Sequence, residues 1–154
     1  LPPPRGSMLD PAPYAAPYAG PIVVTLAYIG LYYLFQVYVL QVKTRLDREY
    51  KARNEPFDRY FGQDRQMLAA DRVQLNMLEH MPPFLVLLWL NAAFVDPRSA
   101  TIAGGVYVGA RALYPLALGT RLGRGVRAAV LLSTAPGYLV LGWFSGALVW
   151  RLVG

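Results

Sequence analysis

The sequence predicts an all-α integral membrane protein, a bundle of four transmembrane helices. The chain is 55% hydrophobic and only 16% charged over 154 residues, which is too apolar for an ordinary soluble domain of this size. Long apolar stretches cover residues 22–42, 75–95, 100–118 and 126–152. Each is close to the roughly twenty residues that cross about 30 Å of hydrocarbon. Basic residues also gather in two of the connections, as they do beside membrane spans.

The positions of the basic residues predict the orientation. Between the first two stretches lie Lys43, Arg45, Arg48, Lys51, Arg53, Arg59, Arg65 and Arg72, and between the last two lie Arg121, Arg124 and Arg127. The opposite side carries little more than Arg98 and Arg151. We therefore expect both basic connections in the cytoplasm and both termini outside it. Because topology accounts for the net charge of +6, we do not expect nucleic acid as a partner.

The residues before the first stretch are expected to add no further domain. The start LPPPRGSM resembles the remnant of a protease-cleaved expression tag, so we leave residues 1–7 out of the fold. Residues 8–21 are rich in Pro, Ala and Tyr and should form an irregular arm at the membrane surface, with Tyr14 and Tyr18 near headgroup level. The four-helix domain is accordingly placed at residues 22–154.

The lack of cysteine and the single histidine limit the reactions and metal sites that the chain can support. The chain has no cysteine, so thiol chemistry would need a thiol from a bound molecule. His80 is the single histidine, and one histidine does not make a metal site. We expect His80 to pack near the interface and expect no bound metal.

A polar cluster opens the second stretch. At about 100° per residue, Arg72, Asn76 and Glu79 point within about 60° of one another and share one helix face. An ionisable group in hydrocarbon costs about 2.5–3.5 kcal/mol, so Glu79 should face a partner helix or a wet cavity. We infer a site for one polar ligand here, next to a kink expected at Pro82 and Pro83.

A further charge lies in the middle of the third stretch. Arg111 needs a buried anionic partner, and Glu79 is the acidic residue that the sequence places deep enough. Tyr107 and Tyr114 lie four residues before and three after Arg111, on the same helix face. A purely structural ion pair is the alternative to a role in ligand binding. For Arg45 and Arg127, the alternative is a role in setting topology or in contacting headgroups.

Two motifs carry a resemblance to a known family. The string R-V-Q-L-N-M-L-E-H-M-P-P-F starts at Arg72, and Y-V-G-A-R ends at Arg111, with a further arginine sixteen residues later. Together they resemble the MAPEG family, the membrane-associated proteins in eicosanoid and glutathione metabolism. Microsomal glutathione transferases and membrane prostaglandin E synthase look most similar. The similarity covers all four stretches, and the two motifs keep register with each other.

The resemblance implies a homotrimer of four-helix subunits that binds glutathione near the cytoplasmic face, in clefts between neighbouring subunits. It implies that the ligand is held by Arg72, Asn76, Glu79, Arg111, Tyr114 and Arg45, with Glu79 suited to the α-amino group. Tyr114 falls where relatives carry His or Tyr, and Arg45 is a looser match because the following loop differs in length. Arg127 matches the arginine thought to stabilise the thiolate, which makes it the expected catalytic residue.

One departure from the family pattern bears on the reaction. Where many relatives place a tyrosine able to hydrogen-bond the sulfur, this chain has Leu118. The resemblance therefore favours a general glutathione transferase acting on lipophilic electrophiles, with lipid hydroperoxide reduction as a further candidate activity, over a specialised isomerase or leukotriene synthase. The alternatives are a non-enzymatic lipid-binding scaffold of the same fold and a small transporter or channel subunit. A different small thiol in place of glutathione also stays open.

The expected location follows from topology. We expect a multi-pass protein of a bacterial inner membrane or the endoplasmic reticulum, with membrane lipid around it and its active site toward the cytoplasm.

Overall fold

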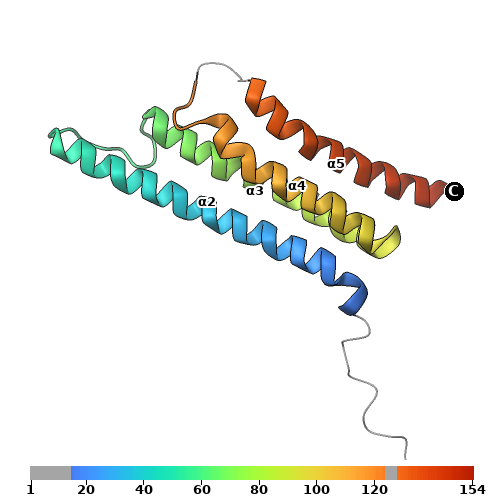
Figure 1. Ribbon diagram of the computed structural model, residues 1–154. Helices are drawn as coiled ribbons and strands as arrows, with labels where there is room; N and C mark the ends of the chain where they lie inside the picture. The colour runs from blue at the N-terminus through green and yellow to red at the C-terminus, as the bar shows by residue number, and fades with distance from the viewer. Residues whose placement is uncertain (1–14, 124–127) are drawn as a thin grey trace, which may run out of the picture.

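The computed structural model describes residues 15–123 and 128–154. Four long helices make up the fold, α2 (Ala19–Ala52), α3 (Arg65–Phe94), α4 (Pro97–Leu118) and α5 (Ala128–Val153), and a 3-10 turn, η1 (Ala16–Tyr18), precedes them. The helices lie side by side and alternate in direction along the chain (Figure 1). The predicted all-α, four-helix architecture is confirmed.

Three helical segments of the described chain are long and apolar enough to cross a membrane, namely 16–52, 65–94 and 128–153. The predicted third span, now α4, falls short by the same measure because its glycines, its tyrosines and Arg111 lower its hydropathy. It packs against α2, α3 and α5 and therefore faces protein on several sides. The chain is a multi-pass membrane protein in which one face of α4 packs against the other helices and the opposite face, with Ile102, Val106 and Leu116, is exposed.

The start of the first helix differs from expectation. Residues 16–21 were expected to be irregular, but they form η1 and the first turn of α2, while residues 8–14 lie outside the described part. Pro21 is tolerated there because first-turn N–H groups have no partner within the helix. Gly20 lies so close to Thr101 that an added Cβ would come within 2.7 Å of its Cγ2 atom. Glycine thus lets this first turn rest on α4.

The second helix begins ten residues before the apolar stretch that predicted it. Asp64 caps α3 by accepting the backbone N–H groups of Gln66 at 2.8 Å and Met67 at 3.1 Å. Burial alone would raise the pKa of Asp64, but these two N–H groups and the Tyr50 hydroxyl outweigh it and lower the pKa. The helix continues unbroken past Pro82 and Pro83. Hydropathy therefore located the apolar part of α3 and missed its first ten residues, 65–74.

Side-chain capping also fixes the turn into α4. Asp96 accepts the backbone N–H of Ser99 at 2.7 Å, and Pro97 occupies the first helical position. At the other end Gly119 has φ of 78°, a conformation that glycine adopts without strain. These two ends make α4 a short, sharply bounded helix between its longer neighbours.

An aromatic and amide core joins the helices. The rings of Phe84 and Tyr107 stack at 4.0 Å, and Tyr28 packs against both. The Tyr28 hydroxyl donates to the carbonyl of Met77 at 2.7 Å, which ties α2 to α3. Asn91 donates from Nδ2 to the carbonyl of Phe144 at 3.0 Å, which ties α3 to α5. Because buried polar atoms need partners, these bonds set the relative register of the helices.

Candidate ligand-binding site

The polar face predicted on α3 separates into an exposed pair and a buried amide. Arg72 Nη1 lies 3.5 Å from Glu79 Oε1, and the two side chains are 45% and 47% exposed. Seven residues return a helix to within about 20° of the same direction, so the pair lies along one line of α3. Asn76, between them in sequence, is rotated toward the core and is only 7% exposed. The exposed pair is open to a ligand from outside the chain.

Arg111 meets Asn76 and not Glu79, so the predicted ion pair was wrong. Its Nη1 donates to Asn76 Oδ1 at 2.6 Å, and Arg111 is 1% exposed. The physical reason is rotation: Glu79 is about 60° further around α3 than Asn76, which turns it out of the α3 and α4 contact. A neutral amide therefore serves the buried guanidinium, while Glu79 pairs with the exposed Arg72.

The surroundings of Arg111 are tight and only partly polar. Its Cζ atom lies 5.1 Å from the Tyr107 ring centroid, in cation–π contact. A Cβ added to Gly137 of α5 would come within 3.2 Å of Arg111 Nη2, so glycine there makes room for the guanidinium. Among the residues that the structure describes, Arg111 Nε and Nη2 have no hydrogen-bond acceptor. The guanidinium thus uses Nη1 for Asn76 and turns Nη2 toward Gly137 of α5.

Tyr114 lies one turn beyond Arg111 on α4. It is 4% exposed and belongs to the same buried cluster as Leu118. The structure thus places Tyr114 on the buried face of α4 together with Arg111, as their spacing predicted. Both are buried, unlike Arg72 and Glu79.

Arg45 lies apart from the Arg72 and Glu79 pair. Its Nη2 donates to Gln66 Oε1 at 2.5 Å, and its Nε lies 3.4 Å from Glu49 Oε1. Gln66 is six residues before Arg72, which is about 120° away around α3. Within one chain, the structure does not bring Arg45 together with Arg72 and Glu79.

A small polar pocket surrounds Arg45. Its volume is about 280 Å³, and it is lined by Tyr38, Val42, Arg45, Gln66, Thr120 and Arg121. No site role was expected for Gln66, Thr120 or Arg121, because only the folded chain brings the first turn of α3 and the segment after α4 to this part of α2. The expected catalytic residue, Arg127, lies outside the described residues.

His80 packs edge-on against Tyr138 of α5, with ring centroids 5.3 Å apart. This contact gives the residue a packing partner on the neighbouring helix, in line with the role expected for it.

Comparison with known proteins identifies the family of the chain. The model of the MAPEG family matches residues 21–150, which include all four helices almost completely. No curated protein matches the chain.

Proposed function

Because this chain belongs to the MAPEG family of membrane proteins, we propose that it is a glutathione transferase that conjugates the glutathione thiolate to lipophilic electrophiles. Reduction of lipid hydroperoxides is a second reaction open to the same thiolate. Among family members, the microsomal glutathione transferases are the group whose activity we assign to it. We place the active site toward the cytoplasm, where the basic connections lie.

The observation that carries this proposal is the exposed Arg72 and Glu79 pair beside Asn76. Glutathione has two carboxylates and one ammonium group, so it needs both a cation and an anion from its site. Arg72 can bind a carboxylate in bidentate fashion, and Glu79 can accept the ammonium group. The pair is 3.5 Å apart and about half exposed, so a zwitterionic ligand can replace their mutual contact with its own groups.

Arg111 and Asn76 then act as a positioning pair. Because Asn76 Oδ1 accepts from Arg111, its Nδ2 is directed away from that guanidinium and is available to donate to a ligand carboxylate. The positive charge of the Arg111 guanidinium, which contacts Asn76, adds positive potential next to the amide. Tyr114 extends the same buried face of α4. These residues fit an anionic group on the ligand.

The separation of Arg45 from Arg72 supports a site between two copies of the chain. A ligand that touches both residues has to lie in a cleft between one copy's Arg72 face and another copy's Arg45 pocket, since Gln66, the partner of Arg45, lies about 120° from Arg72 around α3. A homotrimer provides three such clefts. The peptide would then be held by Arg72, Asn76 and Glu79 from one subunit and by Arg45 from its neighbour.

Arg127 completes the proposed chemistry. A free thiol has a pKa near 8.5 and is mostly protonated at neutral pH, and a nearby guanidinium lowers that pKa by stabilising the anion. The bound thiolate supplies the lone pair that forms a carbon–sulfur bond while the leaving group departs with its bonding electrons. Because Leu118 offers no hydroxyl where relatives carry a tyrosine, Arg127 is the residue left to stabilise the sulfur. The apolar surroundings concentrate the lipophilic partner.

An ultraviolet difference titration tests the proposal. Purified protein is titrated with glutathione near neutral pH, and thiolate absorbance is followed for the wild type, Arg127→Ala, Glu79→Ala and the control Arg98→Ala. We expect saturable absorbance in the wild type and control and loss of this signal in Arg127→Ala. Calorimetric titration, which reads binding without the thiolate, should show retained binding in Arg127→Ala and weakened binding in Glu79→Ala.

Two results would contradict it. If an intact wild-type protein gives no thiolate signal, a non-enzymatic scaffold or a different thiol is the better explanation. If Arg127→Ala and Glu79→Ala lose binding equally, the division between activation and binding is wrong.

A further inference from the structure

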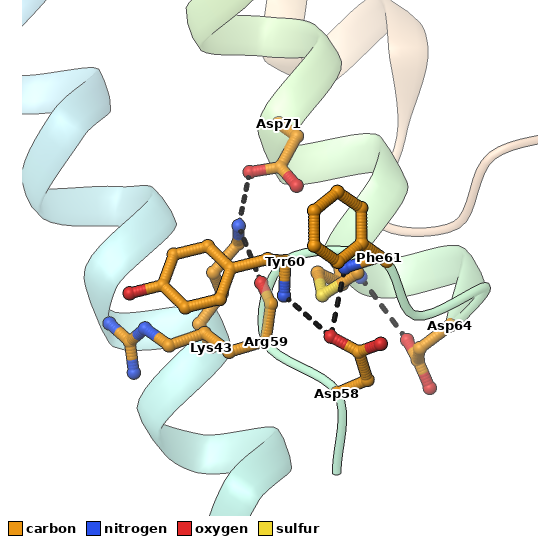
Figure 2. A network of polar contacts seen from close by, with 8 residues as sticks. Lys43, Asp58, Arg59, Tyr60, Phe61, Asp64 and Asp71 are labelled. Atoms are coloured by element: carbon orange, nitrogen blue, oxygen red, sulfur yellow. Dashed lines mark hydrogen bonds and ion pairs between the residues drawn. The ribbon is translucent and has the colours of Figure 1, made fainter.

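The loop between α2 and α3 folds back toward the membrane. Lys43 Nζ lies 2.9 Å from Asp71 Oδ1 and donates to the carbonyl of Arg59 at 3.1 Å, with its side chain only 13% exposed (Figure 2). Lys43 follows directly on the apolar stretch 22–42, whereas α2 ends nine residues later, about 13 Å further from the hydrocarbon. The loop thus leaves the far end of α2 and returns at Arg59 to the level where the hydrocarbon ends.

A side-chain cap fixes the residues that follow Arg59. Asp58 Oδ1 accepts the backbone N–H of Tyr60 at 3.0 Å and that of Phe61 at 2.9 Å. These N–H groups, of Phe61 and then of Tyr60, lower the pKa of Asp58. An added Cβ at Gly62 would come within 3.5 Å of Asp58 Cβ and closer still to its carbonyl, so this turn closes tightly. We refer to residues 58–61 as the Asp58 turn.

The Asp58 turn presents two large aromatic rings that contribute little to the chain's own core. Tyr60 is 78% exposed and Phe61 is 84% exposed. In Figure 2 the Tyr60 ring lies beside Lys43, and the Phe61 ring lies on the α3 side between Asp58 and Asp71. Exposed aromatic rings held by a fixed backbone turn are typical of a contact surface and not of a core.

These rings lie at the level where the apolar stretch 22–42 ends, which is the level of the membrane–water interface. Aromatic residues gather at the membrane–water interface, where an apolar ring and a polar tip meet the headgroup layer. Arg59 adds a cation beside them, and within the described chain its guanidinium has no ion-pair partner. Anionic lipids of the cytoplasmic leaflet attract such a cation.

We propose that the Asp58 turn is a membrane anchor, in which Tyr60 and Phe61 insert into the headgroup layer and Arg59 binds the phosphate of an anionic phospholipid. Lys43 and Asp71 hold the anchor at the correct depth through the Arg59 carbonyl. The anchor is separate from the Arg72 and Glu79 site and does not depend on glutathione binding.

The absence of cysteine from the chain allows a clean test, since a single introduced cysteine takes one label. An environment-sensitive fluorophore is attached to Phe61→Cys or, as a control in the same loop, to Gln63→Cys. Each protein is reconstituted in phosphatidylcholine vesicles with and without phosphatidylglycerol. We expect the label at 61 to be blue-shifted and severalfold more strongly quenched by shallow nitroxide lipids than the label at 63. Aqueous iodide should quench the two labels in the reverse order.

Two outcomes would overturn the anchor. Equal quenching of both labels by iodide would mean that Phe61 is in water. Protection from iodide without quenching by nitroxide lipids at any depth would mean that protein, such as a second copy of the chain, covers it.

Two further variants test the supporting residues. In the protein labelled at position 61, Asp71→Asn should shift the emission toward that of the water-exposed control. An unchanged emission would mean that Lys43 and Asp71 do not hold the anchor in place. Arg59→Gln should remove the extra blue shift that phosphatidylglycerol produces. An unchanged lipid response would exclude Arg59 as the phosphate ligand.

Discussion

Arg111 of α4 donates to Asn76 of α3 across 2.6 Å, and both side chains are buried. The bond links the one charged residue of the described core to an amide that lies beside the exposed Arg72 and Glu79 pair. A change at this bond should therefore affect both helix packing and any ligand held by the pair.

Asn76→Leu should destabilise the protein. The variant leaves Arg111 Nη1 without its acceptor, and a lost hydrogen bond to a charged group costs about 1.5–3 kcal/mol. Asn76→Asp keeps an oxygen acceptor and should retain most of the stability. Thermal unfolding in detergent, followed by tryptophan fluorescence, measures the difference. Gln74→Leu on the same helix is the matched control and should have a small effect. If Asn76→Leu has an effect as small as that of the control, Arg111 has another acceptor.

The sequence predicted the helices better than it predicted the contacts within the site. Hydropathy found the four helices because burial in lipid requires long apolar runs, but it missed the turns of α3 before residue 75. Glu79 was expected to pair with Arg111 because the two lie at a similar depth in their spans. Asn76 pairs with Arg111 instead, because Glu79 points about 60° away from Asn76 around α3. Only packing fixes that rotation. Arg45 was grouped with Arg72 through the family resemblance, and a single chain cannot test that grouping because the resemblance implies a cleft between subunits.

Two adjacent glycines of α4 should respond differently to alanine. A Cβ at Gly104 would lie 2.8 Å from Val24 Cγ1 and 2.9 Å from Leu88 Cδ1, whereas a Cβ at Gly105 meets nothing within 4 Å. Overpacking a core costs about 1–3 kcal/mol, so Gly104→Ala should lower the unfolding temperature. Gly105→Ala should leave it unchanged or raise it slightly because alanine favours helix. If Gly105→Ala is as damaging, its face must be covered by another copy of the chain.

The Asp58 turn should loosen in acid. The pKa of Asp58 is lowered below its ordinary value of 3.8 by the N–H groups of Phe61 and Tyr60. Its contribution to stability is therefore present above 3.8 and is lost as the pH falls through the lower, folded-state pKa. Hydrogen exchange of the peptide that contains Tyr60 and Phe61, corrected for intrinsic rates, should show falling protection below pH 3.8. Asp58→Asn keeps an acceptor that does not titrate, so a similar loss in that variant would assign the effect elsewhere.

Glu79→Gln should weaken glutathione binding more than it weakens folding. Glu79 is about half exposed and pairs with Arg72 at 3.5 Å, so its loss costs little in the unliganded protein. In the complex it would lose a charged partner for the ligand's ammonium group, worth about 1.5–3 kcal/mol, which is about 10-fold to 150-fold in Kd. Calorimetric titration with glutathione, alongside desamino-glutathione, measures this loss. For the analogue without the ammonium group, wild type and Glu79→Gln should bind alike, and a persistent difference would show that Glu79 acts on another part of the ligand.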